Sequence, residues 1–270
     1  MSIVQIDYLG KNVNKLICGN IVRIGGSVNQ LLNYRGKSVQ DINILDGGFG
    51  SIKSVFQSSR KELKKIFIRK LKQEIKYLVM GSKIPLDRKT VELDMHYGAQ
   101  KKELKNRFDS VISSNVLEHS PNIIFLLLNL HFIVKKNGFM FHALPNFNYT
   151  FDRYRKPTDL DHFIYDFENK TGFDDSTHTA DYIQSAIVKD GYQKDFHKKY
   201  PVKYPYMHFH VFDIDNTNQL FSYIFEGVEC SLIRTDQFSD NLVLCSNELN
   251  KNFKNKYISL INQIENGTYY

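Results

Sequence analysis

A very apolar segment between two strand-like segments most limits what this chain can fold into. Residues 122–134 (NIIFLLLNLHFIV) follow a Ser-Pro pair, which suits the start of a helix, and precede the sequence KKNG, which suits its end. On either side, residues 110–113 (SVIS) and 139–143 (FMFHA) are typical of buried strands. A strand, a helix and a strand in this order predict two parallel strands covered by a helix.

The same alternation extends towards the N-terminus. Strands are predicted at residues 43–46, 75–80 and 90–93, and a helix at 51–72, where apolar side chains recur every three or four positions. We therefore expect an α/β fold with a doubly wound, mostly parallel sheet of the Rossmann-like type.

The alternation stops after residue 146. Residues 146–207 are rich in Tyr, Phe, Asp, His and Lys and contain two helical stretches, near 158–169 and 179–190, which indicate an insertion. The chain beyond them predicts a helix, two strands joined by a polar turn and a last helix, at 215–226, 228–235, 241–246 and 249–264. The two strands predict an antiparallel hairpin at the C-terminal end of the sheet.

These elements predict a single domain with three parts. Residues 1–40 form an N-terminal cap, residues 41–146 and 208–270 form the core, and residues 147–207 form an inserted, mainly helical lid.

Composition indicates the charge of the partner and the cellular compartment. The formal charge is +7, from 36 Lys and Arg against 29 Asp and Glu, which favours an anionic partner. The three Cys show no C-x-x-C spacing and lie in apolar segments, as reduced core cysteines of a cytoplasmic protein do. The sequence has neither a signal peptide nor an apolar run long enough to span a membrane, so we expect a cytoplasmic protein without a membrane span.

The segment ILDGGFG at residues 44–50 predicts a ligand site. An apolar strand ends there in Asp46, and Gly48 and Gly50 follow before a predicted helix. Glycine lets the backbone approach a ligand closely, and the free N–H groups at the start of a helix can bind it.

Residues 108–119 (FDSVISSNVLEH), with the helix and strand that follow, resemble the class I S-adenosylmethionine-dependent methyltransferases. In that family a D-x-G-x-G turn and an adenine-binding acid precede a strand of the FDxV type at roughly constant spacings. Asp46 lies 48 residues before Asp94, and Asp94 lies 15 residues before Asp109, which fits this order.

A rival glycine turn, IVRIGGSVN at residues 21–29, competes for the same role. It has Arg23 where the acid is expected, 86 residues before Asp109, which is about one βα unit too far. We favour the later turn and keep Gly25 and Gly26 as the alternative.

The resemblance implies S-adenosylmethionine as the cofactor. The residues that it implies for cofactor binding are Asp46, Gly48, Gly50, Asp94, Met95, Ser114 and Asn115. Asp94 would accept a hydrogen bond from the adenine amino group, and Ser114 and Asn115 would line the sulfonium. Glu118, in the same motif, suits the dipole of the following helix as well as it suits a functional role.

One departure from the family concerns the ribose. Members carry an acidic residue at the end of the second strand, where it holds the ribose hydroxyls. The segment predicted as that strand, residues 75–80, is followed here by Gly81, Ser82 and Lys83. Ribose binding is therefore unexplained.

Residues 143–178, followed by MHFHVF at 207–212, resemble a subgroup of these enzymes with a TFDRxR block, associated with bacterial surface-polysaccharide synthesis. The resemblance implies O-methylation of a small phosphorylated or nucleotide-linked sugar for capsule or another surface glycan. We expect Arg153, Arg155 and His119 to bind this acceptor, because a guanidinium fork suits phosphate.

Acidic and histidine side chains of the insertion and of the segment after it are the candidate bases. We select Asp152, His178 and His210 as catalytic, with His162 and His208 as further candidates. His208 and His210 alternate along an extended segment and share one face. Such a pair could ligate a metal, but a hydrogen-bonded buried pair is commoner, so we expect no metal.

These observations favour a cytoplasmic S-adenosylmethionine-dependent methyltransferase acting on a small anionic acceptor. Nucleic acid is not the favoured partner, and a homodimer stays open. Two alternatives remain. The first is an RNA methyltransferase, suggested by the basic charge, and the second is a catalytically inactive methyltransferase-like partner protein, suggested by the missing ribose acid.

Overall fold

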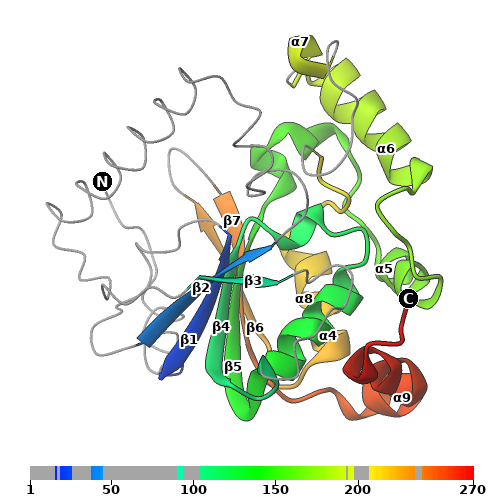
Figure 1. Cartoon of the computed structure of the whole chain (residues 1–270). Coiled ribbons are helices and arrows are strands. Elements are labelled where there is room, and N and C mark those ends of the chain that lie inside the picture. The colour runs from blue at the N-terminus through cyan, green and yellow to red at the C-terminus, as the bar shows by residue number, and fades with distance from the viewer. Residues whose placement is uncertain are drawn as a thin grey trace, which may run out of the picture.

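A seven-stranded sheet lies at the centre of the computed structural model, which describes residues 16, 19–25, 38–44, 90–93, 104–192, 194–197, 207–234 and 239–270 (Figure 1). The strands are β1 (Asn20–Gly25), β2 (Ser38–Ile44), β3 (Thr90–Leu93), β4 (Phe108–Ser114), β5 (Val134–Pro145), β6 (Glu229–Arg234) and β7 (Ser239–Ser246). Their order in the sheet is β3-β2-β1-β4-β5-β7-β6.

The first five strands run parallel, and β7 pairs antiparallel with both β5 and β6. This confirms the expected α/β class, with a mostly parallel sheet and a C-terminal antiparallel hairpin. The strand order reverses between β1 and β4, which is where open parallel sheets bind ligands at their carboxyl ends.

The position of β1 corrects the predicted boundaries. Residues 1–40 were expected to form a cap, but Asn20–Gly25 is an interior strand of the sheet and pairs with both β2 and β4. Ile21 is buried on one face of the sheet, while Val22 and Ile24 are buried on the other. A short apolar run that is buried on both faces is what a central parallel strand requires. The strand predicted at 75–80 and the helix predicted at 51–72 lie outside the described residues.

Four helices cover one face of the sheet (Figure 1). They are α4 (Ile123–Ile133), α5 (Leu160–Glu168), α8 (Ile214–Ile224) and α9 (Lys251–Asn266). Helix α4 is the predicted apolar helix, and the side chain of Asn122 caps it by accepting a hydrogen bond from the Phe125 N–H. Its residues are apolar on nearly every side, which is why nearly all of them can be buried. No helix within the described ranges has the length and apolar character needed to cross a bilayer.

The expected lid at 147–207 divides into two parts. Phe163 and Phe167 of α5 belong to the main core beside α4, so α5 is part of the layer that covers the sheet. The other part is a smaller apolar cluster that includes Tyr182, Met207 and Phe209. The short helix η4 (Phe151–Tyr154), helix α6 (Ser176–Tyr182) and its π-helical continuation η5 (Ile183–Lys189) contribute to this cluster. The inserted segment also contains the short helices η3 (Phe147–Tyr149) and α7 (Lys194–His197).

Candidate functional site

The carboxyl end of β4 lies at the point where the strand order reverses. Ser114, its last residue, is in register with Gly25 of β1 on one side and Ala143 of β5 on the other. Asn115 follows with φ of 52°, a left-handed conformation that Asn tolerates better than most residues. Its backbone N–H donates to the carbonyl oxygen of Ala143 at 3.0 Å. Two of the residues expected to contact the cofactor, Ser114 and Asn115, therefore sit at this edge.

Glu118 lies in the short helix η2 (Leu117–His119) that follows this turn. Its side chain is 1% exposed, and neither carboxyl oxygen has a hydrogen-bond partner among the described residues. Burial raises the pKa of Glu118 to about 7, against the opposing influence of His208. A carboxyl group with a pKa near neutrality can both take up and release a proton under physiological conditions.

His208 and Asp152 form a buried pair beside Glu118. His208 Nδ1 lies 2.5 Å from Asp152 Oδ2, and Arg155 Nη1 donates to Asp152 Oδ1 at 2.9 Å. Burial alone would raise the pKa of Asp152, but His208 and Arg155 hold it below its usual range. The carboxylate is therefore ionised, so Nδ1 of His208 carries a hydrogen, and in the neutral ring Nε2 has the lone pair. That Nε2 lies 3.9 Å from Glu118 Oε1.

His119 completes this group from the side nearest solvent. Its Nδ1 lies 2.8 Å from the carbonyl oxygen of Met207, and its Nε2 lies 3.8 Å from Glu118 Oε1. The rings of His119 and His208 meet edge to face, with centroids 4.7 Å apart. We call Glu118, His119, Asp152 and His208 the β4-edge group. A histidine oriented by a carboxylate is suited to take a proton from a substrate hydroxyl.

The β4-edge group could alternatively hold a cation. One ligand atom from each of Glu118, His119 and His208 lies within 4.8 Å of the others. Two imidazoles and one carboxylate are ligands of a type that divalent transition metals accept.

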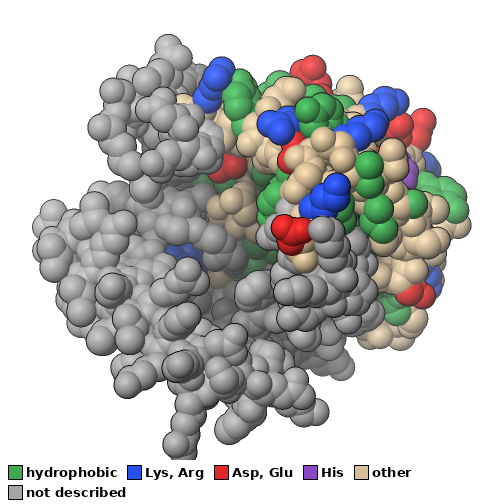
Figure 2. Space-filling model, turned by 90° about the horizontal axis from the view of Figure 1, so that it is seen from above, with side chains coloured by type: hydrophobic (Ala, Val, Ile, Leu, Met, Phe, Trp, Pro, Cys, Tyr) green, Lys and Arg blue, Asp and Glu red, His purple; other side chains and the backbone are tan. Residues whose placement is uncertain are grey.

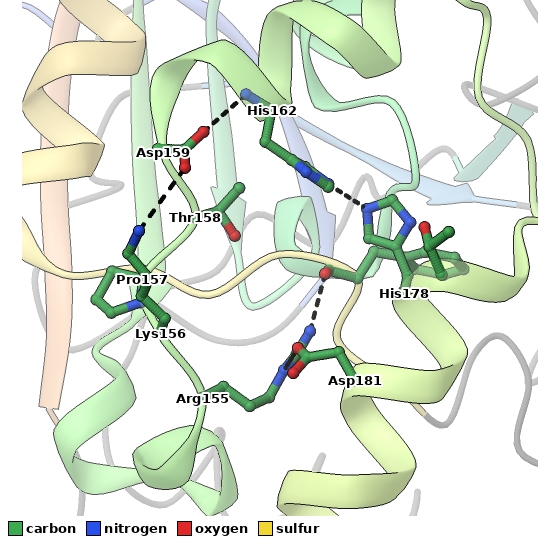
Figure 3. A pocket seen from close by; sticks show the side chains of 10 residues that line it. Arg155, Lys156, Pro157, Thr158, Asp159, His162, His178 and Asp181 are labelled. Atoms are coloured by element: carbon green, nitrogen blue, oxygen red, sulfur yellow. Dashed lines mark hydrogen bonds and ion pairs between the residues drawn. The ribbon is translucent and has the colours of Figure 1, made fainter.

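Neither arginine expected to bind phosphate presents a free fork. Arg155 is buried and donates to Asp181 Oδ2 at 2.6 Å and to the carbonyl oxygens of His208 and Phe209 at 2.8 and 3.0 Å (Figure 3). With Asp152 as a further acceptor, Arg155 positions the β4-edge group, and these contacts within the protein do not favour the expected role in binding the acceptor. Arg153 is 53% exposed and pairs with Asp190 at 2.5 Å.

The two other expected bases, His178 and His210, are not in the β4-edge group. They lie with His162 around the carboxylate of Asp166. His208 and His210 were expected to share one face of an extended segment, but His208 contacts Asp152 and His210 contacts Asp166. The two side chains therefore enter different groups.

Sequence reasoning missed the importance of two acids. It left Glu118 between a structural and a functional role, and it did not select Asp166. The available signal was their position, because Glu118 belongs to the VLEH motif and Asp166 lies four residues after His162 on α5. Asp46, Gly48, Gly50, Asp94 and Met95 lie outside the described residues.

No protein-family model and no curated protein matches the chain. A solved S-adenosylmethionine-dependent methyltransferase from Methanosarcina mazei is 11% identical, with 90% of this chain and 99% of that chain covered and a TM-score of 0.46. The trans-methyltransferase CalH in complex with SAH is 15% identical, with 88% and 54% covered and a TM-score of 0.43. For the citrinin polyketide synthase CMeT domain the values are 10% identity, 86% and 47% covered, and a TM-score of 0.43.

The chain spans about half the length of the first solved structures that it matches, between 47% and 54%. With TM-scores below 0.5, these likenesses do not extend to cofactor, substrate or activity.

Proposed function

We propose that the chain is an S-adenosylmethionine-dependent methyltransferase whose cofactor binds at the carboxyl ends of β1 and β4. The observation that carries the proposal is the register of Gly25 with Ser114 at the strand-order reversal, with Glu118 only four residues further along the chain. Ligands of open parallel sheets bind outside the carboxyl ends of the strands at this point. The motif FDSVISSNVLEH, which carries the family resemblance, ends at the same place.

The strand order favours the earlier of the two glycine turns. Gly25 ends β1, next to β4, whereas Gly48 and Gly50 follow β2, one strand further out. We therefore assign the methionine part of the cofactor to Gly25 and Gly26, in place of the turn at Gly48 and Gly50.

The same reassignment makes an acidic residue available to bind the ribose hydroxyls. Asp46 comes two residues after the end of β2, and Asp94 comes directly after the end of β3. Asp46 thereby becomes our candidate for the ribose hydroxyls, and Asp94 remains the candidate for adenine, with Met95 beside the ring. This assignment would remove the departure noted in the sequence, because the strand that precedes Asp46 and pairs with β1 is β2 (Ser38–Ile44).

The bound cofactor would supply an electrophilic methyl group on a positively charged sulfur. His208, held by Asp152, would take the proton of the acceptor hydroxyl on Nε2 and so prepare the oxygen to accept the methyl group that the cofactor would supply. Glu118 lies behind His208 as a second proton carrier, and His119, with its side chain 26% exposed, lies on the solvent side, where it can contact the acceptor. Ser114 and Asn115 would line the sulfonium.

We propose a small phosphorylated or nucleotide-linked sugar as the acceptor, O-methylated in the cytoplasm for capsule or another surface glycan. The support is the net charge of +7 and the resemblance in the TFDRxR block. On the face seen in Figure 2, basic side chains of the described surface are interspersed with acidic ones and do not gather into one patch. Nucleic-acid binding usually depends on such a patch, so this face does not favour RNA.

Calorimetric titration with S-adenosylhomocysteine tests the proposal. We expect saturable one-to-one binding, weakened by Asp46→Ala and by Asp94→Ala. Asp215→Ala, which removes an exposed acid in the first turn of α8, is the matched control and should bind like the wild type. Absence of binding at about 1 mM ligand would reject the cofactor site. Binding to bulk RNA that persists at about 0.2 M salt would favour the RNA alternative.

A further inference from the structure

Three histidines lie around one carboxylate oxygen of Asp166, where α5 and α6 of the inserted segment meet the segment before α8. Asp166 Oδ2 lies 2.9 Å from His210 Nε2, 3.3 Å from His162 Nε2 and 3.4 Å from His178 Nε2. The Nε2 atoms of His162 and His178 are themselves 2.9 Å apart, and Figure 3 shows the His162 side chain pointing towards the His178 ring. All four ligand atoms lie within 4.8 Å of one another. We call these residues the Asp166 group.

The outer nitrogens determine where the ring hydrogens lie. His178 Nδ1 is 2.8 Å from Asp175 Oδ1, and His210 Nδ1 is 3.0 Å from the carbonyl oxygen of Ser120. Both partners can only accept a hydrogen bond, so each Nδ1 carries a hydrogen. In the neutral rings the two Nε2 atoms then point lone pairs at the carboxylate of Asp166. Lone pairs directed at an anion repel it unless a metal ion lies between them or a ring takes up a proton. Burial opposes a charge on His178, but its hydrogen bonds to Asp166 and Asp175 raise its pKa, whereas burial lowers the pKa of His210 to about 4, so a proton can relieve this repulsion at His178 but not at His210 near neutral pH.

This arrangement of ligands is typical of a metal site. A histidine that binds a metal usually donates its other N–H to a carboxylate or a backbone carbonyl, which orients the ring. His178 and His210 each have such a partner.

The separations suit a tetrahedral ion. Ligands at about 2.0–2.2 Å from zinc in tetrahedral geometry lie roughly 3.3–3.5 Å from each other. Four of the separations in the Asp166 group are 2.9, 2.9, 3.3 and 3.4 Å. For these four pairs a zinc ion requires an outward shift of only a few tenths of an ångström, and the two remaining separations, from His210 to the other histidines, are at most 4.8 Å.

Burial and access are consistent with a bound ion. The side chains of Asp166, His178 and His210 are 2%, 4% and 0% exposed, whereas that of His162 is 41% exposed. His162 and His178 line a cavity of about 210 Å³ that also includes Thr158 and Thr177 (Figure 3). The cavity gives an ion a path to the otherwise buried ligands.

We propose that His162, Asp166, His178 and His210 bind one zinc ion, which fastens the inserted segment to the core. The ligands come from helix α5, from helix α6 and from the segment that precedes α8. Four protein ligands complete a tetrahedron, and this composition indicates a structural site. The ion would join α5, which packs in the main core, to α6, which packs in the smaller cluster with Met207 and Phe209.

The test is the metal content of the full chain, purified without a histidine tag and measured by mass spectrometry of the elements. We expect about one zinc per chain. His162→Ala and Asp166→Asn should each lower this stoichiometry severalfold, and a chelator should lower the melting temperature of the wild type but not that of His162→Ala. His162 is the preferred residue to replace, because it is partly exposed and its loss leaves the buried side chains in place. The control is His131→Ala, whose Nδ1 lies 2.8 Å from Asn247 Oδ1, outside both histidine groups.

Cobalt supplies a second readout on the wild-type protein. Co²⁺ added to chelator-treated protein should give the visible absorption of a tetrahedral site, and zinc should displace it. This measurement does not depend on whether a variant folds. The proposal is overturned if the wild type holds less than about 0.1 equivalent of metal and takes up neither ion. It is equally overturned if His208→Ala loses the metal while His162→Ala and Asp166→Asn keep it, because the ion would then belong to the β4-edge group.

Discussion

Asp152 Oδ2 lies 2.5 Å from Nδ1 of His208, and both residues are buried. The pair is held from behind by Arg155, which donates to the Asp152 carboxylate and to the backbone carbonyl of His208. Asp152 thus sets which nitrogen of His208 can accept a proton. The predictions below follow from this arrangement and from the burial around it.

His208→Ala should slow methyl transfer by about 10²- to 10⁴-fold, the usual contribution of a general base. Asp152→Asn should act in the same direction, because an amide can stabilise the wrong tautomer of His208. The affinity for S-adenosylhomocysteine should stay the same in both variants. Single-turnover rates and calorimetry measure the two quantities, with His131→Ala as a control. Equal rates in the wild type and in His208→Ala would show that another group takes the proton.

Arg155→Ala should destabilise the fold far more than Arg153→Ala. Arg155 is 2% exposed, and removing it leaves the buried Asp152 carboxylate without its cation, which costs about 3–5 kcal/mol. Arg153 forms a pair on a side chain that is 53% exposed, and such pairs contribute about 1 kcal/mol or less. Urea unfolding of the two variants makes the comparison. Similar losses in both would contradict a structural role specific to Arg155.

His142 should make the protein less stable in acid. It is fully buried on β5, with Nδ1 2.7 Å from Ser113 Oγ, and burial lowers its pKa to about 3. In the unfolded chain His142 therefore binds a proton near pH 6.5, whereas in the folded chain it stays neutral until the pH approaches 3. As the pH falls through this window, the free energy of unfolding should decrease by up to about 1.4 kcal/mol per unit. Urea unfolding between pH 7 and pH 4.5 measures the slope. His142→Gln should flatten it, and an unchanged slope would place the effect elsewhere.

Asn115 should tolerate glycine but not valine. Its φ of 52° is easy for glycine, whereas a β-branched residue should lose roughly 1–2 kcal/mol of stability there. Asn115→Gly keeps the turn and removes the side chain, so it separates a backbone role from a contact with the cofactor. We expect stability close to that of the wild type and weaker binding of S-adenosylhomocysteine. Unchanged binding in Asn115→Gly would show that the Asn115 side chain does not contact the cofactor.

Elements specified by local pattern were predictable from the sequence. Helix α4 forms where an unbroken apolar run begins and ends with suitable residues, and β3 and the hairpin of β6 and β7 fall where the strand patterns predicted them. The motif ending at His119 likewise lies at the carboxyl end of β4, where the sequence placed it. These features depend on neighbours within a few residues of each other, so their physical cause is present in the sequence itself.

The position of a strand within the sheet and the partner of each charged side chain were decided only by the tertiary structure. The segment of β1 reads as a short apolar run with one arginine, and nothing local shows that it pairs with β4, about 90 residues later. The partners Asp152 and His208 are 56 residues apart, and Asp166 and His210 are 44 apart. Which of several similar histidines meets which carboxylate depends on how α5, α6 and the segment before α8 pack together. Packing also buries these groups, and burial makes an unpaired charge costly enough to require the partners that the fold provides.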